Sequence, residues 1–258
     1  MVDAVRLALT WMTVLPFGGS GSPDARAAGR AMTALPVVGL VCGLAATGVA
    51  HGAHALGAGA TLSGVAGVAA VLALTRAMHV DALADTADGL GSYAEPARAR
   101  EIMRSGSVGP MGAAVLVVVL LAEVAALGAL VDAGAWVAPV AAFVLSRCLP
   151  VAQLRRGVPA AAATIFGALV AGSQSRAAVT TTGLLAAMAG AALAVGTTAA
   201  SAWWAPAAGA ALGVAAYAAA AGFARHAVRR LGGISGDVLG ATIEAGTAAA
   251  LAAAVLLV

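Results

Sequence analysis

The chain has 258 residues, of which 62% are hydrophobic and only 10% are charged. Soluble globular domains are roughly 45–50% apolar, so this composition excludes an ordinary soluble protein and indicates a protein embedded in a lipid bilayer. The net charge is +3, and all 14 basic residues are arginines. They are scattered through short segments without the basic face or aromatic platform that nucleic-acid binding needs, so we expect no nucleic-acid partner.

Alanine and glycine dominate the sequence, and aromatic residues make up only 4% of it. Strands need more β-branched and aromatic residues than this chain supplies, whereas small residues let membrane helices pack closely. We therefore predict an all-α fold, a polytopic bundle of about six to eight transmembrane helices. No internal repeat or linker divides the chain, so residues 1–258 are expected to form one membrane domain.

The chain begins with a predicted interfacial helix, because Asp3 and Arg6 precede the apolar run L-A-L-T-W-M-T-V-L-P-F. Apolar runs of about 20 residues, the length that crosses a bilayer, then mark the candidate spans. They lie at 32–51, 57–75, 110–131, 136–154, 177–200, 204–224 and 238–258. The apolar run at 159–172 is shorter, and we expect it to be a re-entrant or surface segment.

Arginines occur in every second connection between these apolar runs. They precede the first and last spans and occupy 76–109 and 155–176, whereas the connections near His51, Asp132 and Trp203 have none. With seven spans, the positive-inside rule places every arginine-bearing connection in the cytoplasm. We therefore expect the longest polar stretch, 76–109, to face the cytoplasm.

The segment H-V-D-A-L-A-D-T-A-D-G-L, residues 79–90, is the most informative part of the chain. On a helix, Asp81, Asp85 and Asp88 would project within about 40° of one another. Such close like charges are unfavourable unless a cation lies among them. Mg²⁺ prefers carboxylate oxygens and often completes its shell with phosphate. The segment predicts a Mg²⁺ site for a phosphorylated substrate; the alternative is a polar helix end whose acids only face water.

His79 lies two residues before Asp81 and so points to the opposite face of a continuous helix. It can join the aspartates only if the helix begins near it. The sequence leaves a catalytic histidine and a packed or solvated histidine equally open.

The next polar segment, A-R-A-R-E-I-M-R-S-G-S-V-G-P-M-G, covers residues 97–112. Arg100 and Arg104 have the i, i+4 spacing that can clamp a phosphate. Gly109 and Pro110 predict a helix start, whose free amides favour anions. The alternative is a cytoplasmic loop whose arginines serve topology alone.

A second polar segment, R-R-L-G-G-I-S-G-D-V-L-G-A-T-I-E, covers residues 229–244. Ser235 or Asp237 can cap the helix that follows. Asp237 and Glu244 share a face of that helix, and Glu244 lies about two turns into the membrane, where a carboxylate is a functional candidate. If the segment approaches the three aspartates, Asp237 completes their metal site. A flexible turn with accessible amides is formed by Gly232, Gly233 and Gly236.

Two other ionisable residues, Glu123 and Arg147, fall within predicted spans. We expect them to pair across helices in a structural role. Cys42 and Cys148 match no metal-binding spacing and are expected to be buried, inert thiols.

The segment at 79–90 closely resembles the H-x-D-G-L-A-D-T-x-D-G-L signature of the cobalamin synthase family, the adenosylcobinamide-GDP ribazoletransferases. Four other pieces agree in the same order. L-T-W-M-T-V-L-P resembles the family's L-T-R-L-P, and A-L-P-V-V-G-L-V-C-G resembles P-L-V-G-L-x-x-G. R-E-I-M-R-S-G-S-V-G-P-M-G resembles E-I-M-(K/R)-D-S-x-x-G-x-x-G, and R-R-L-G-G-I-S-G-D-V-L-G-A resembles R-x-G-G-x-T-G-D-x-L-G-A.

Some positions depart from the family pattern. Ala82 replaces the usual glycine, and Ser235 replaces threonine. Residues 105–107 are Ser-Gly-Ser where an aspartate-bearing stretch is common, and residues 158–167 lack the expected Gly-Leu-Gly pattern.

The resemblance implies the last assembly step of the cobalamin nucleotide loop in the bacterial cytoplasmic membrane. α-Ribazole, or its 5′-phosphate, attacks the cobinamide-linked phosphate of adenosylcobinamide-GDP, and GMP leaves. Asp81, Asp85 and Asp88 would hold Mg²⁺ on the diphosphate, with Asp237 as a further ligand. One of these carboxylates or His79 would take the proton from the ribazole hydroxyl. The expected substrate and phosphate ligands are Arg100, Arg104, Arg230, Gly233, Ser235 and Gly236. The sequence leaves a homo-oligomer and contacts with other cobalamin-pathway enzymes open.

Two other classes compete with this interpretation. CDP-alcohol phosphatidyltransferases also use spaced aspartates on membrane helices, but their D-G-x-x-A-R…G-x-x-x-D-x-x-x-D pattern is absent, since no arginine follows Ala84. A cation or metabolite transporter would carry carboxylates near the bilayer midplane, often on broken helices. Here most acids are predicted at one membrane face, with Glu123 and Glu244 as the exceptions.

Overall fold

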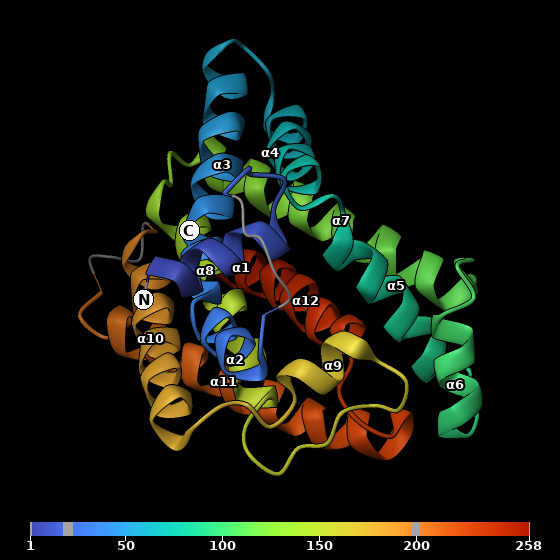
Figure 1. Ribbon diagram of the computed structural model, residues 1–258. Coiled ribbons are helices and arrows are strands. Elements are labelled where there is room, and N and C mark those ends of the chain that lie inside the picture. Colours follow the sequence, from blue (N-terminus) through green and yellow to red (C-terminus); the bar gives the residue numbers. More distant parts are fainter. Residues whose placement is uncertain (1, 18–22, 198–201, 258) are drawn as a thin grey trace.

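A computed structural model describes residues 2–17, 23–197 and 202–257 (Figure 1). Within these ranges the chain is helical and no strand forms, which confirms the all-α prediction. The helices are α1 (Val2–Met12), α2 (Ala25–Thr33), α3 (Leu35–Ala55), α4 (Ala60–Thr75), α5 (Met78–Gly91), α6 (Pro96–Met103), α7 (Pro110–Asp132), α8 (Val137–Gln153), α9 (Ile165–Val170), α10 (Arg176–Val195), α11 (Ala205–Leu231) and α12 (Gly236–Val255).

Each of the seven predicted spans coincides with a helix, but the helices differ in their ability to cross a bilayer. Within the described ranges, α3, α7, α10, α11 and α12 are long and apolar enough to cross, and α4 with α5 forms a sixth candidate that is bent by 89°. Taken singly, α4 and α8 are short, with 16 and 17 residues. The chain is therefore a multi-pass membrane protein with five or six candidate crossings, at or just below the expected range of six to eight. The predicted span ends at 198–200 and 258 lie outside the described residues.

The short apolar run at 159–172 forms no long helix. Its helix α9 has only six residues, and its start pairs with the connection between α11 and α12. There the Ile234 amide donates to the Pro159 carbonyl at 2.9 Å, and the Ala161 amide donates to the Ile234 carbonyl at 2.9 Å. The run is therefore anchored beside the start of α12.

Glycines bring the long helices into close contact. In the α10–α11 pair, a Cβ added at Gly190 would overlap the carbonyl of Gly209, and one added at Gly213 would overlap that of Ala186. In the α3–α8 pair, a Cβ at Gly39 would lie 2.5 Å from the Phe143 carbonyl oxygen. These contacts fit the expectation that small residues pack the membrane helices.

The break between α4 and α5 positions the polar helix α5. Arg76 and Ala77 both adopt the left-handed conformation, with φ of 56° and 54°, which is uncommon for residues that carry a Cβ. The chain turns by 89° there, and α5 then packs along α12 and α7. Ala82 lies against Gly240 of α12, where an added Cβ would be only 2.5 Å from the Ala82 Cβ.

Candidate active site

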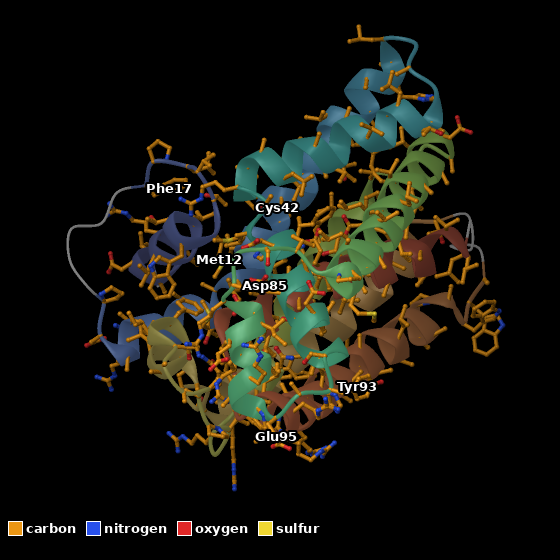
Figure 2. All side chains as sticks on the ribbon, turned by 90° about the vertical axis from the view of Figure 1, so that its right-hand side faces the viewer. Met12, Phe17, Cys42, Asp85, Tyr93 and Glu95 are labelled. Carbon is orange, nitrogen blue, oxygen red and sulfur yellow. The ribbon has the colours of Figure 1, made fainter. Side chains whose placement is uncertain are left out.

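The three aspartates of α5 share one face but lie in different surroundings. Asp81 is exposed, Asp85 is half-buried and Asp88 is only 8% exposed. Figure 2 shows Asp85 on α5, with Tyr93 and Glu95 in the connection that follows this helix. The face predicted from the sequence therefore runs from solvent into the protein.

Asp88 binds the N-terminus of α7. The amide of Gly109 donates to its Oδ2 at 2.7 Å, and the amide of Gly112 donates to its Oδ1 at 2.8 Å. Gly109 itself offers no side-chain cap, so Asp88 satisfies two amides that would otherwise lack partners. A Cβ at either glycine would overlap the Asp88 carboxylate. The helix start predicted to attract an anion is therefore already occupied by a carboxylate of the same chain.

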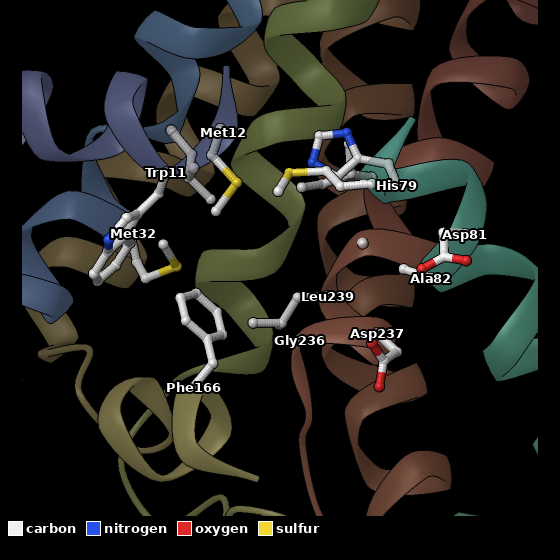
Figure 3. A pocket seen from close by; sticks show the side chains of 14 residues that line it. Trp11, Met12, Met32, His79, Asp81, Ala82, Phe166, Gly236, Asp237 and Leu239 are labelled. Atoms are coloured by element: carbon white, nitrogen blue, oxygen red, sulfur yellow. The ribbon is translucent and has the colours of Figure 1, made fainter. Parts of the chain in front are cut away.

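A cavity of about 370 Å³ lies beside the exposed end of this face (Figure 3). Asp81 from α5 and Asp237 from α12 line it together on one side. His79 also lines it, because α5 begins at Met78 and the histidine lies in the first turn. The opposite wall is apolar and consists of Trp11, Met12, Met32 and Phe166.

His79, on the side of the cavity that carries Asp81, has an unusual environment. The side chain is only 4% exposed, and neither ring nitrogen has a hydrogen-bond partner. A buried polar group without a partner is costly. The imidazole is therefore available to a ligand in the cavity.

Negative charge concentrates around Asp85, since the charges of Asp81, Asp237 and Asp88 all act on it. Among the described residues the only ion pair joins Arg98 to Glu101, on the surface, so no arginine forms an ion pair with these acids. No three Asp, Glu, His or Cys side chains in the described ranges lie close enough to surround a metal ion. The predicted ligands thus do not form a preformed four-carboxylate cage. Mg²⁺ commonly takes one or two carboxylates and completes its shell with water and substrate phosphates, and Asp81 and Asp237 fit that role.

A narrow crevice, which Asp237 also lines, contains the two arginines of the predicted clamp. Arg100, Arg104 and Ser235 line it with Asp237. Arg100 donates to the Leu231 carbonyl at 2.8 Å and so ties α6 to the end of α11. Arg104 is exposed, reaches the Ala162 carbonyl at 3.4 Å and acts electrostatically on Asp237. Arg104 is therefore the freer of the two for a phosphate.

The model of the family described as cobalamin-5-phosphate synthase matches residues 4–255, nearly the whole chain. The chain belongs to this family. It is 36% identical to the adenosylcobinamide-GDP ribazoletransferase of Corynebacterium efficiens over 252 residues, which cover 95% of this chain and 88% of that relative. Its identity to the enzymes of the same name from Nocardioides sp. and Frankia casuarinae is 34% and 35%; the first match covers 98% of both chains, the second 97% of this chain and 94% of the relative. No solved structure matches the chain.

The family motif at 229–244 surrounds the start of α12. Ser235 caps the helix, because its Oγ accepts from the Val238 amide at 3.3 Å, and it also donates to Asp237 Oδ2 at 3.2 Å. Gly236 lines the cavity. Gly233, with φ of 152°, lies so close to the backbone of residues 160–161 that a Cβ would overlap it. Gly233 therefore serves the anchoring of that segment and does not line the cavity or the crevice.

Arg230 contacts neither Asp81 nor Asp237. Its guanidinium lies over the Tyr93 ring, 5.1 Å from the centroid, and so links α11 to the connection after α5. The structure thus brings Asp81, Asp237, His79 and Gly236 together around one cavity and leaves Arg230 outside it.

The apolar wall was not predicted from the sequence. Trp11, Met12 and Met32 come from the N-terminal helices, and Phe166 comes from the segment 158–167, which departs from the family pattern. Trp11 and Met12 lie in the segment L-T-W-M-T-V-L-P, which resembles a family motif but carries no charged or metal-binding group that would indicate a site. One signal was available. Trp11 and Phe166 are aromatic, and aromatic residues make up only 4% of the chain.

The prediction that Glu123 and Arg147 pair across helices was wrong. No ion pair joins them within the described residues. Arg147 instead donates to Ser146 at 2.9 Å and to Thr247 at 2.8 Å. Glu244 is buried on α12 and does not line the cavity.

Proposed function

We propose that this chain transfers the adenosylcobinamide phosphate group from adenosylcobinamide-GDP to α-ribazole, or to its 5′-phosphate, with release of GMP. This reaction closes the nucleotide loop of cobalamin. One observation carries the proposal: Asp81 and Asp237, the aspartates of two separate family motifs, line one cavity from neighbouring helices.

Phosphoryl transfer asks a protein mainly to position the reactants and to neutralise charge. A ribose hydroxyl of ribazole attacks the phosphorus attached to cobinamide. The bond from this phosphorus to the bridging oxygen breaks, and the oxygen leaves with GMP. The hydroxyl proton passes to a base at the cavity wall. Asp81 and His79 are the candidates for this base: Asp81 is exposed at the cavity, and the buried ring nitrogens of His79 lack a partner.

Asp81 and Asp237 would hold Mg²⁺ against the diphosphate, with Asp85 contributing negative charge from the adjacent turn of α5. When bound, the ion would neutralise phosphate oxygens and the leaving GMP. Arg104 lies beside Asp237 and would bind a phosphate oxygen of the guanosine part. Asp88 would act as a positioning residue, because both its oxygens accept amides of α7.

The site faces the cytoplasm in this proposal, in a bacterial cytoplasmic membrane. The distribution of the arginines supports this orientation: nitrogen-tipped side chains gather at the end of the molecule that carries Tyr93 and Glu95 (Figure 2). Cytoplasmic connections carry the excess of positive charge in membrane proteins. The guanosine diphosphate part of the substrate would then approach from the compartment that contains nucleotides.

The test is GMP release by the detergent-purified protein, given adenosylcobinamide-GDP, α-ribazole and Mg²⁺, with and without a chelator. We expect release that requires both substrates and stops with chelator. Asp81→Asn should lower the rate on the order of a hundredfold or more, because it removes charge stabilisation in the transition state. Asp132→Asn, at the exposed last residue of α7, should leave the rate unchanged. No GMP release from the folded wild type would overturn the proposal.

A further inference from the structure

The cavity has two chemically different halves. Its polar side carries Asp81, Asp237 and His79, while its other side presents two aromatic rings and two methionines. The rings of Trp11 and Phe166 stand edge to face, with centroids 5.3 Å apart and planes at 72°. Met12 and Met32 line the same side and are buried, at 9% and 1% exposure. The halves fit a ligand that has a flat apolar part and a polar part.

The size of the cavity limits which substrate it can hold. Small-molecule pockets range from roughly 300 to 1,000 Å³, and this cavity, at about 370 Å³, lies near the small end. A corrin macrocycle with its amide side chains and nucleotide is far too large for it. The acceptor is small: ribazole is one methylated benzimidazole, a flat and largely apolar bicycle, joined to a ribose.

We infer that this cavity is the acceptor site, with the benzimidazole against Trp11 and Phe166 and the ribose toward Asp81, Asp237 and His79. This inference rests on the proposed function. Aromatic rings and methionine sulfur favour the binding of a flat aromatic ligand. The unpartnered ring nitrogens of His79 gain a hydroxyl partner when the ribose lies at the polar side. The cavity thereby directs the attacking hydroxyl toward Asp81 and Asp237 on its polar side.

The inference makes Phe166 a specificity residue for the acceptor. In Phe166→Leu the ring is lost while the position stays apolar, so the KM for ribazole should rise roughly two- to tenfold. The KM for adenosylcobinamide-GDP should not change. Phe17→Leu is the matched control, since Phe17 is 40% exposed and does not line the cavity. Benzimidazole alone should compete with ribazole in the wild type and compete less well in Phe166→Leu.

Equilibrium dialysis of ribazole against the purified protein separates this inference from the proposed function, because binding needs no turnover. If the wild type binds ribazole, Phe166→Leu binds it more weakly and no GMP is released, the acceptor site is confirmed and the proposed reaction is wrong. If GMP is released normally and Phe166→Leu keeps the wild-type KM and ribazole binding, the assignment of the cavity as the acceptor site is wrong, while the proposed reaction is supported. An equal rise in KM for both substrates, or no ribazole binding by the wild type, would also overturn it.

Discussion

Asp88 and Asp81 lie on one face of α5 and belong to one motif, yet their partners differ. Asp88 holds two amides of α7, whereas Asp81 is exposed at the cavity. In Asp88→Asn an amide nitrogen replaces one acceptor oxygen, and the charge facing the N-terminus of α7 disappears. The expected cost is about 1–2 kcal/mol of stability, or a melting temperature lower by roughly 2–8 °C. Asp81→Asn should melt like the wild type but lose turnover. Thermal unfolding of both variants in detergent checks this, and equal melting curves would assign Asp88 no capping role.

The spacing and local chemistry of individual residues explain which site residues the sequence could predict. Spacing placed Asp81, Asp85 and Asp88 on one face. The cap at Ser235 and the helix start at Pro110 followed from local chemistry. Spacing could not distinguish a carboxylate that meets a ligand from one that meets backbone amides. That distinction depends on Gly109 and Gly112, which reach Asp88 across more than 20 residues of chain.

Among the elements, the contact between α5 and α7 fixes the polar face. A Cβ in Gly112→Ala would overlap the Asp88 carboxylate and lie 2.9 Å from the Ala84 carbonyl oxygen. The start of α7 would have to move away from α5, at a cost of about 1–3 kcal/mol. We expect a lower melting temperature and reduced GMP release. Gly222→Ala on α11 is the matched control, because nothing lies within 4 Å of its Cβ, and alanine favours the helix by up to about 1 kcal/mol. Equal effects of both variants would show that the close approach at Gly112 is unimportant.

The helices themselves were predictable because apolar length and composition dominate this chain. The turn between α4 and α5 was not, since Arg76 and Ala77 adopt left-handed conformations without a glycine or proline to mark them. The anchoring of the segment at 159–161 was equally hidden. It depends on hydrogen bonds to Ile234, more than 70 residues later in the chain.

At the scale of the whole molecule, the acceptor wall shows the limit of motif reasoning. The polar half of the cavity comes from two motifs with recognisable chemistry. The apolar half combines Trp11 and Phe166, which only the folded chain brings within 5.3 Å of each other. Apolar residues that are far apart in the sequence have no characteristic spacing from which a shared wall could be predicted. The sequence therefore predicted the reacting groups but not the surface that positions the acceptor.

The orientation of the molecule in the membrane gives the last prediction. The turn between α3 and α4 and the connection after α6 lie at opposite ends of the molecule (Figure 1). Leu56 in the first is 91% exposed, and Ser105 in the second is exposed. The native thiols Cys42 and Cys148 are fully buried, so the wild type should not react with a membrane-impermeant maleimide. Because arginine-bearing connections remain in the cytoplasm, Ser105→Cys should react only in inside-out vesicles and Leu56→Cys only in right-side-out vesicles. The reverse pattern would place the aspartate site outside the cytoplasm and remove its access to nucleotide substrates, whereas the expected pattern places the site and guanosine diphosphate in one compartment.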